Sequence, residues 1–316
     1  MKILVTGGCG YTGTILVNKL LDLKHRVNVI DTQWFGNHLK KHKNLRVFRE
    51  DIRNFNIKMM KDIDVIYHLA NIANDPSVEL NPSLSWEVNV LATKRLIETA
   101  IKYKVKQFIF ASSGSVYGVK KEKKVTEELN CVPISIYNKT KMIAERVLKS
   151  YSNDIKIHCI RPATVCGFSP RMRLDVSVNM FVHQALTRGE MIIFGGKQVR
   201  PNIHINDLVD VYIHFLNNKK IQPGCYNAGF ENLKILDIAK MVQKYIPSKI
   251  TIKKKNTDPR SYRQDSSKLL KTGFKQKYRV IDAINDIKQR YKKKSILIDE
   301  KCSTVKWMKK LGLANG

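Results

Sequence analysis

The chain has 316 residues, with 57 Lys or Arg and 27 Asp or Glu, so its formal charge is +30 at pH 7. This length can bury a large core, and no stretch reaches the roughly 20 apolar residues of a membrane-spanning helix. The lysines are spread along the chain in short runs, without a recognised nucleic-acid-binding motif. We therefore interpret the charge as solvated surface lysine, and expect neither a membrane nor a nucleic acid as partner.

The six cysteines are scattered, and no two of them have the Cys-x-x-Cys spacing. The sequence opens on an apolar run typical of a strand, without the charged region and apolar segment of a secretion signal. We expect reduced thiols, no metal site and a cytoplasmic location.

The first residues predict a dinucleotide site. Lys2–Thr6 form the short apolar run that a buried parallel strand requires, and they lead into Gly7-x-x-Gly10-x-x-Gly13. Such glycines permit a tight turn and a close approach of the backbone. The N-terminus of the helix that follows offers free N–H groups to a pyrophosphate.

A second strand, expected over Val27–Ile30, ends at Asp31. At this place a carboxylate accepts hydrogen bonds from an adenosine ribose, and its charge would repel a 2′-phosphate. The sequence therefore predicts NAD rather than NADP as the cofactor.

Strand and helix patterns alternate through the first half of the chain. Further strands are expected at 45–48, 65–69, 108–110 and 155–160, and helices at 82–103 and 134–151. This alternation predicts a Rossmann-type, doubly wound parallel sheet of the α/β class, with its ligand beyond the carboxyl ends of the strands. The residues at or just after such ends are Asp31, Asp51, Ala70 and Ser113. We therefore expect them to share one site.

Tyr137 and Lys141 are the candidate catalytic pair. Residues four apart share one face of a helix, so the hydroxyl and the ammonium group can approach the same point. A nearby cation favours the phenolate and lowers the pKa of a tyrosine. Ser113 could hold a substrate oxygen at that point while the tyrosine removes its proton.

After residue 168 the loops grow longer, and arginines stand in polar turns. These arginines are Arg171, Arg173, Arg200, Arg260 and Arg263. Guanidinium groups bind phosphate through paired hydrogen bonds, so they are candidates for a diphosphate clamp, with surface or structural roles as the alternative. The C-terminal residues through Lys309 predict a lysine-rich helical tail without an assigned role.

From residue 1 to about 290 the chain resembles the extended short-chain dehydrogenase/reductase family, in its NAD-dependent nucleotide-sugar epimerase/dehydratase branch. The matching segments are Thr6–Gly13, Asp31, Asp51-Ile52, His68–Ala70, Asn89–Thr93, Ser112–Gly118, Tyr137–Lys141, Arg161–Val165, Arg200–Asp207 and Tyr226–Gly229. The resemblance implies an NAD-binding Rossmann domain over 1–167. Residues 168–316 would form mainly a smaller substrate-binding lobe, with some segments returning to the Rossmann domain.

The resemblance also implies roles for single residues. Tyr137 would be the acid/base, Lys141 would lower its pKa and hold the nicotinamide ribose, and Ser113 would bind the reacting hydroxyl. The cofactor-binding positions would be Gly7, Gly10, Tyr11, Thr12, Gly13, Asp31, Asp51, Ile52, Leu69 and Ala70, together with Tyr137 and Lys141. The residues at the nucleotide diphosphate of the substrate would be Asn179, Arg200 and Arg260.

Departures from the family pattern narrow the chemistry. Sugar 4,6-dehydratases of this branch carry Thr-Asp-Glu just before Val-Tyr-Gly, where this chain has Ser113-Gly114-Ser115. Because both acids are missing, we do not expect dehydration. In the substrate lobe, Pro201 replaces the usual Asp after the phosphate-binding Arg, and Cys166 replaces the Tyr of Arg-Pro-x-x-Val-Tyr-Gly.

We therefore expect an NAD-dependent nucleotide-sugar epimerase that acts through a transient 4-keto sugar. The alternative is a C4 dehydrogenase or 4-ketoreductase, with a GDP-linked heptose or hexose as candidate substrate, because Ser169–Asp175 resembles a segment of one such dehydrogenase. A further class is a non-catalytic NAD-binding regulator or RNA-associated protein, which the intact Ser113, Tyr137 and Lys141 disfavour. By analogy with the family we expect a homodimer, formed through the helices at 82–103 and 134–151.

Overall fold

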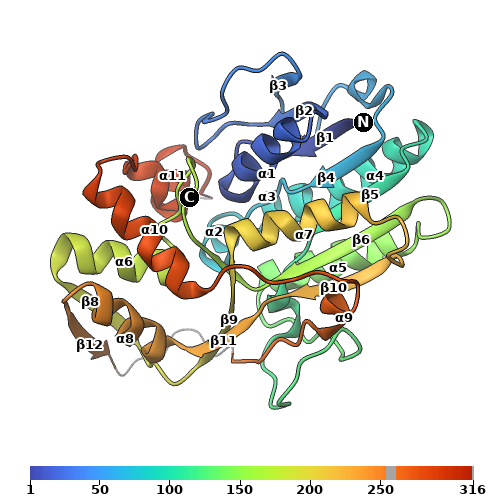
Figure 1. Cartoon of the computed structure of the whole chain (residues 1–316). Coiled ribbons are helices and arrows are strands. Elements are labelled where there is room, and N and C mark those ends of the chain that lie inside the picture. The colour runs from blue at the N-terminus through green and yellow to red at the C-terminus, as the bar shows by residue number, and fades with distance from the viewer. Residues whose placement is uncertain (254–260, 315–316) are drawn as a thin grey trace.

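A computed structural model describes residues 1–253 and 261–314 of the chain. Its centre is a seven-stranded parallel sheet in the order β3-β2-β1-β4-β5-β6-β10 (Figure 1). The strands are β1 (Lys2–Thr6), β2 (Arg26–Asp31), β3 (Leu45–Arg49), β4 (Val65–His68), β5 (Gln107–Ala111), β6 (Lys156–Pro162) and β10 (Gly224–Ala228). The direction of the strand order reverses between β1 and β4, where sheets of this kind bind ligands. The predicted Rossmann-type sheet is confirmed.

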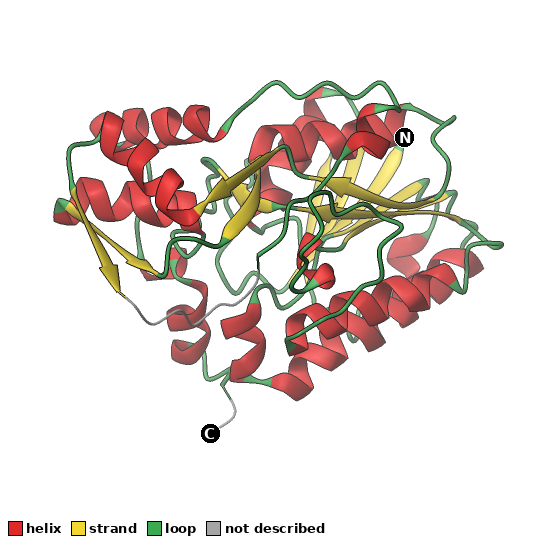
Figure 2. Ribbon diagram, turned by 90° about the horizontal axis from the view of Figure 1, so that it is seen from below, coloured by secondary structure: helices red, strands yellow, loops and turns green. Residues whose placement is uncertain are grey.

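Helices cover both faces of this sheet (Figure 2). One face carries α1 (Tyr11–Asp22), α7 (Ile205–Asn217) and the short α9 (Ser267–Leu270). The other carries α2 (Asp75–Leu80), α3 (Pro82–Trp86), α4 (Ala92–Lys102) and α5 (Ile136–Lys149), with a 3₁₀ turn, η1 (Ile57–Met60), before β4. The strands read as continuous apolar runs because both of their faces are buried. Successive residues such as Ile3 and Leu4 enter opposite cores.

The long helix expected at 82–103 forms with one local difference. A π turn over Glu87–Leu91 joins α3 to α4, and such turns are frequent at functional sites. Asn89 of this turn accepts a hydrogen bond from the N–H of Ile72 at 2.8 Å and donates one to the Thr140 hydroxyl at 3.1 Å. The π turn therefore ties the loop after β4 to α5, the helix that carries the candidate catalytic pair.

The smaller lobe has its own sheets and its own apolar core. Its elements are β7 (Thr164–Cys166), β9 (Val199–His204) and β11 (Glu231–Lys234) in one sheet, β8 (Glu190–Phe194) with β12 (Lys249–Lys253) in another, and helices α6 (Ser177–Arg188), α8 (Ile235–Tyr245) and α10 (Val280–Lys292). The lobe's core lies between these three helices. Three elements beyond residue 168, namely β10, α7 and α9, belong to the layers of the large sheet. The division into 1–167 and 168–316 stays a prediction.

The C-terminal residues pack onto the protein rather than extending from it as a tail. A 3₁₀ turn, η4 (Glu300–Cys302), and α11 (Thr304–Lys310) follow α10, and α11 packs against α2. Met308 is buried in the same core as Ile72 and Val78. The sequence predicts this helix but not its packing against α2. Lysines dominate the stretch, so the few apolar residues on one face of the helix do not stand out in the sequence. Among the described residues, no helix is long and apolar enough to cross a membrane.

Candidate active site

A cavity of about 600 Å³ opens at the carboxyl ends of the central strands. It gathers most of the residues that the sequence predicts for the site. Those lining it are Gly7, Gly10, Tyr11, Thr12, Gly13, Asp31, Asp51, Ile52, Leu69, Ala70, Ser113, Tyr137, Lys141 and Arg200. The predicted cofactor and catalytic residues thus share one cavity with one of the three predicted substrate residues.

The glycine turn between β1 and α1 leaves no room for side chains at two positions. Gly7 has a φ of +73°, and a Cβ placed on it would lie 2.6 Å from the backbone nitrogen of Ala70. A Cβ on Gly13 would lie 2.2 Å from the carbonyl oxygen of Gly7. Because Gly10 precedes α1 without a side chain to cap it, the first N–H groups of that helix face the cavity as an anion-binding site.

Asp31 is held in place at the end of β2. Its two carboxylate oxygens accept hydrogen bonds from the backbone N–H of Cys9 at 2.9 Å and of Gln33 at 2.7 Å. Burial raises the pKa of this carboxyl, and the two backbone bonds act in the opposite direction. Each oxygen keeps a second lone pair that can accept from a ribose hydroxyl.

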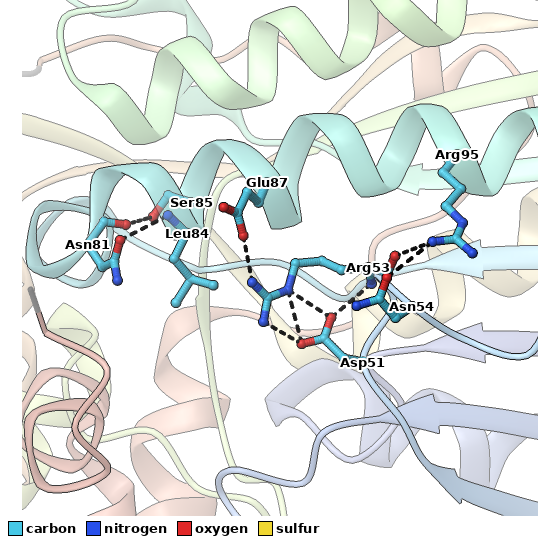
Figure 3. Close-up of polar contacts among 8 residues, drawn as sticks. All are labelled: Asp51, Arg53, Asn54, Asn81, Leu84, Ser85, Glu87 and Arg95. Carbon is cyan, nitrogen blue, oxygen red and sulfur yellow. Dashed lines mark hydrogen bonds and ion pairs between the residues drawn. The ribbon is translucent and has the colours of Figure 1, made fainter.

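Asp51 is oriented by a chain of charged contacts (Figure 3). The Arg53 guanidinium donates to its carboxylate, with Nη2 to Oδ2 at 2.9 Å, and also to Glu87 Oε2 at 2.6 Å. Arg95 Nη1 donates to the carbonyl oxygen of Arg53 at 2.5 Å. These side chains are partly exposed, so the contacts add little stability. Their effect is to fix the loop after β3 against the π turn and α4.

Tyr137 and Lys141 lie one turn apart at the start of α5. Ser135 caps this helix by accepting from the N–H of Asn138 at 3.2 Å, so Tyr137 stands in the first turn, where the helix dipole favours a negative charge. Lys141 is 1% exposed, and its Nζ donates to the carbonyl oxygen of Ala111 at 2.7 Å. Burial lowers the pKa of Lys141 to about 7, and Glu145 opposes that shift.

Ser113 begins the 3₁₀ turn η3 (Gly114–Tyr117) directly after β5. Its Oγ lies 2.7 Å from the Oγ of Ser115 and accepts from the Ser115 N–H at 3.2 Å. Asn138 of α5 donates to the Ser115 hydroxyl at 3.0 Å. Ser115 therefore positions the Ser113 hydroxyl within the cavity, and it is a site residue that the sequence suggests only through its place beside Ser113.

One predicted substrate residue, Asn179, does not appear among the described residues that line the cavity. The Asn179 side chain is engaged within the protein, because it accepts from the Gly167 N–H at 2.9 Å and donates to the Tyr11 hydroxyl at 3.0 Å. It also donates to the carbonyl oxygen of Arg173 at 2.9 Å. Arg260 lies outside the described residues. The substrate role of both stays a prediction.

The cavity is also lined by residues to which the sequence assigns either no role or only a candidate clamp role. Arg171 and Arg173 line it, as the clamp hypothesis for the lobe arginines anticipates. Thr304 and Met308 of α11 line it as well, and no local pattern in the sequence points to them. No group of three His, Cys, Asp or Glu that could hold a metal occurs within residues 1–253 and 261–314.

The residues present fit a dinucleotide. The glycine turn places helix N–H groups at a pyrophosphate position, Asp31 stands at a ribose position, and Arg171 has a buried Nε without a hydrogen-bond partner among the described residues. With the Tyr137–Lys141 pair beside them, the fold and the site define an NAD-binding oxidoreductase of the Rossmann type.

Comparison with known proteins narrows this class. The model of the NAD dependent epimerase/dehydratase family matches residues 3–229. An uncharacterized UDP-glucose epimerase of Bacillus subtilis (strain 168) is 32% identical over 269 residues, which are 80% of this chain and 84% of that protein. A UDP-glucose 4-epimerase of Lactobacillus helveticus is 27% identical over 312 residues, 90% of this chain and 94% of that protein.

A solved structure agrees with these relatives. UDP-glucuronic acid 4-epimerase from Bacillus cereus, in complex with UDP-glucuronic acid and NAD, superimposes with a TM-score of 0.82 at 30% identity, covering 92% of this chain and all of that one. The chain belongs to the NAD dependent epimerase/dehydratase family. It is an NAD-dependent enzyme of the nucleotide-sugar epimerase and oxidoreductase type.

Proposed function

We propose that this protein is a nucleotide-sugar 4-epimerase that acts through a transient 4-keto sugar. The observation that carries the proposal is the buried Lys141, one helical turn after Tyr137, in the cavity that also holds Ser113 and the cofactor-binding residues. This set can remove a hydroxyl proton beside a hydride acceptor.

Each member of the trio has a defined task. The Tyr137 phenolate takes the proton of the sugar C4 hydroxyl, and later returns it to the C4 oxygen. Ser113 holds that oxygen by a hydrogen bond, and the Lys141 ammonium favours the phenolate form of the tyrosine. When bound, NAD supplies the acceptor for the C4 hydride and the donor that returns it to the opposite face of the ketone.

The nucleotide is proposed to be uridine diphosphate. Support comes from the relatives, whose names state UDP-sugars as substrates or ligands. Arg200 lines the cavity, and Arg173 has a buried Nη2 without a hydrogen-bond partner among the described residues. A guanidinium with free donors suits the phosphate and hydroxyl oxygens of such a ligand, because an unpaired buried N–H costs free energy.

Elimination of water is not part of the proposal. Gly114 and Ser115 occupy the places of the two acids that 4,6-dehydratases of this family use. Neither glycine nor serine carries a carboxylate, and the Ser115 hydroxyl is hydrogen-bonded to Ser113 and to Asn138. We also propose a homodimer through the helix at 82–103, which comprises α3, the π turn and α4, together with α5. The exposed side chains of Trp86 and Leu91 on the first of these helices give support.

A panel of nucleotide sugars tests the proposal. The purified protein is incubated with UDP-linked hexoses and hexuronic acids, and with GDP-linked hexose and heptose. Products are identified by NMR while NADH absorbance is followed. The proposal expects a C4 epimer of one UDP-sugar without net NADH. Stoichiometric NADH, or a released 4-keto sugar, would instead indicate a C4 dehydrogenase or 4-ketoreductase.

A further inference from the structure

The C-terminal helix α11 contributes one wall of the cavity. Thr304 and Met308 stand four residues apart, so they share one face of the helix, and both line the cavity. They are 4% and 2% exposed, although the neighbouring Lys309 is exposed. The helix therefore has an inner face toward the site and an outer lysine face toward solvent.

Hydrogen bonds hold this segment against both halves of the protein. On the Rossmann side, the indole Nε1 of Trp307 donates to the carbonyl oxygen of Trp34 at 2.6 Å. Trp34 stands only three residues after Asp31, the predicted ribose acceptor. The C-terminal helix is thus fastened to the loop that begins at the adenosine end of the cofactor site.

On the side of the lobe, the attachment reaches the loop after β7. The N–H of Thr304 donates to Asp175 Oδ2 at 3.1 Å, and the N–H of Leu174 donates to the carbonyl oxygen of Cys302 at 2.9 Å. Asp175 in turn accepts from Arg173 Nε at 2.9 Å. The segment 302–308 therefore bridges the two halves of the protein, and its residues Thr304 and Met308 line the cavity.

Arg171 of the same loop is a buried arginine beside this bridge, and its contacts indicate which ligand the cavity takes here. Its side chain is 4% exposed and lines the cavity, with the guanidinium 4.0 Å from the centre of the Phe35 ring. Burial and the neighbouring Arg173 lower the pKa of this guanidinium, whereas Asp175 and, more weakly, Asp31 raise it. Its Nε finds no acceptor among the described residues. Leaving an N–H of a buried guanidinium unpaired costs free energy, so we expect an oxygen of a bound ligand to accept from this Nε.

We propose that Arg171 and the inner face of α11 complete the adenosine side of the NAD site and hold the cofactor between turnovers. Arg171 would donate to an oxygen of the adenosine half, and Met308 would cover its apolar surface beside Ile52. The chemistry fits because an adenosine joins an apolar base to oxygen-rich ribose and phosphate groups. Retention suits the proposed epimerase, which returns its cofactor to the starting state in each cycle.

The rate of NAD release tests this inference without any sugar. Protein loaded with NAD is freed of unbound cofactor by rapid desalting, and release is followed with an enzyme that consumes free NAD. We expect release to become roughly tenfold faster in Met308→Ala and in Arg171→Met, because each variant loses a contact with the cofactor; tenfold corresponds to about 1.4 kcal/mol. Lys309→Ala, on the outer face of the same helix, should release NAD at the rate of the unchanged protein.

Thermal unfolding of each NAD-free variant shows whether it is folded. If Met308→Ala or Arg171→Met does not fold, Trp307→Phe serves as the test variant. This change removes the hydrogen bond to Trp34 and leaves a smaller aromatic ring in place, so it should release NAD several-fold faster. Unchanged release in the folded variants, or an equal acceleration in Lys309→Ala, would overturn the inference. Because no sugar is present, either result leaves the epimerase proposal open to its own test.

Discussion

Glu145 and Arg161 form a buried ion pair one helical turn beyond Lys141. Arg161 Nε donates to Glu145 Oε1 at 2.9 Å and its Nη2 donates to Oε2 at 2.7 Å, with both side chains 7% exposed. Burial opposes the charge on Arg161, but the bonds to Glu145 raise its pKa above the ordinary arginine value. Lys141 thus shares its helix face with a carboxylate that is held in a buried ion pair.

This pair leads to a prediction for the pH dependence of activity. Glu145 raises the pKa of Lys141 against the effect of burial, so Glu145→Gln should lower that pKa further. Lys141 loses its proton when the pH exceeds its pKa, and the phenolate then loses its cation. The alkaline limb of the kcat/KM profile should therefore move to lower pH.

The control for this change is Glu98→Gln, an exposed carboxylate on α4 that pairs with Lys94. Its profile should match that of the unchanged protein. An alkaline limb in Glu145→Gln that stays in place, or moves to higher pH, would show that Glu145 does not act on Lys141.

Lys141 should also make the stability of the NAD-free protein depend on pH. Burial brings its pKa to about 7, against the ordinary 10.5 of an unfolded chain. Between these values the unfolded state binds more protons, so the free energy of unfolding rises with pH by up to about 1.4 kcal/mol per pH unit. Lys141→Met lacks this group.

Denaturant titrations at several pH values between about 6 and 10 measure the free energy of unfolding of both proteins. The free energy of unfolding of the unchanged protein, minus that of Lys141→Met, should be flat below pH 7 and rise above it. A difference that stays constant across the range would mean that the lysine is not shifted.

Tyr137→Phe should abolish turnover while NAD stays bound. The change removes one hydroxyl, and with it the group that accepts the sugar proton, so we expect a loss of roughly 10²–10⁴-fold in kcat. Equilibrium NAD binding measured on the same preparation separates chemistry from cofactor loss. Turnover within a few-fold of the unchanged enzyme would remove Tyr137 from the acid/base role.

Ser113→Ala should lower kcat/KM by roughly 10- to 100-fold, because the bond it loses goes to an oxygen that gains charge during the reaction. Ser115→Ala is the matched neighbour. The Ser115 hydroxyl lies 2.7 Å from the Ser113 hydroxyl. Ser115 therefore acts by orienting Ser113, and its replacement should lower kcat/KM by less. Steady-state kinetics on both variants compare the two serines, and a larger loss in Ser115→Ala would reverse their roles.

The local part of the site could be predicted from the sequence. Glycine spacing, a carboxylate at a strand end and a Tyr-x-x-x-Lys helix face depend on neighbours within a few residues, and the structure places all of them in one cavity. The structure also gives a local physical reason for a glycine at position 13, because a Cβ placed there would meet the carbonyl oxygen of Gly7.

The remaining features depend on contacts between distant parts of the chain. The hydrogen bond between Trp307 and Trp34 joins residues 273 positions apart, and no local sequence pattern near either tryptophan predicts it. The stacking of Arg171 on Phe35 depends in the same way on how the lobe meets the Rossmann half. The burial that lowers the pKa of Lys141 is likewise a property of the packed protein.

The central claim is that the C4 hydride leaves the sugar and returns to it within one active site. The most direct test uses the UDP-sugar accepted in the panel, deuterated at C4, with a catalytic amount of protein in ordinary water. Mass spectrometry and NMR then locate the deuterium in the product. The account predicts a C4 epimer that keeps its deuterium at C4, with no net NADH. A product that has lost the deuterium, or NADH formed together with a free 4-keto sugar, would contradict it.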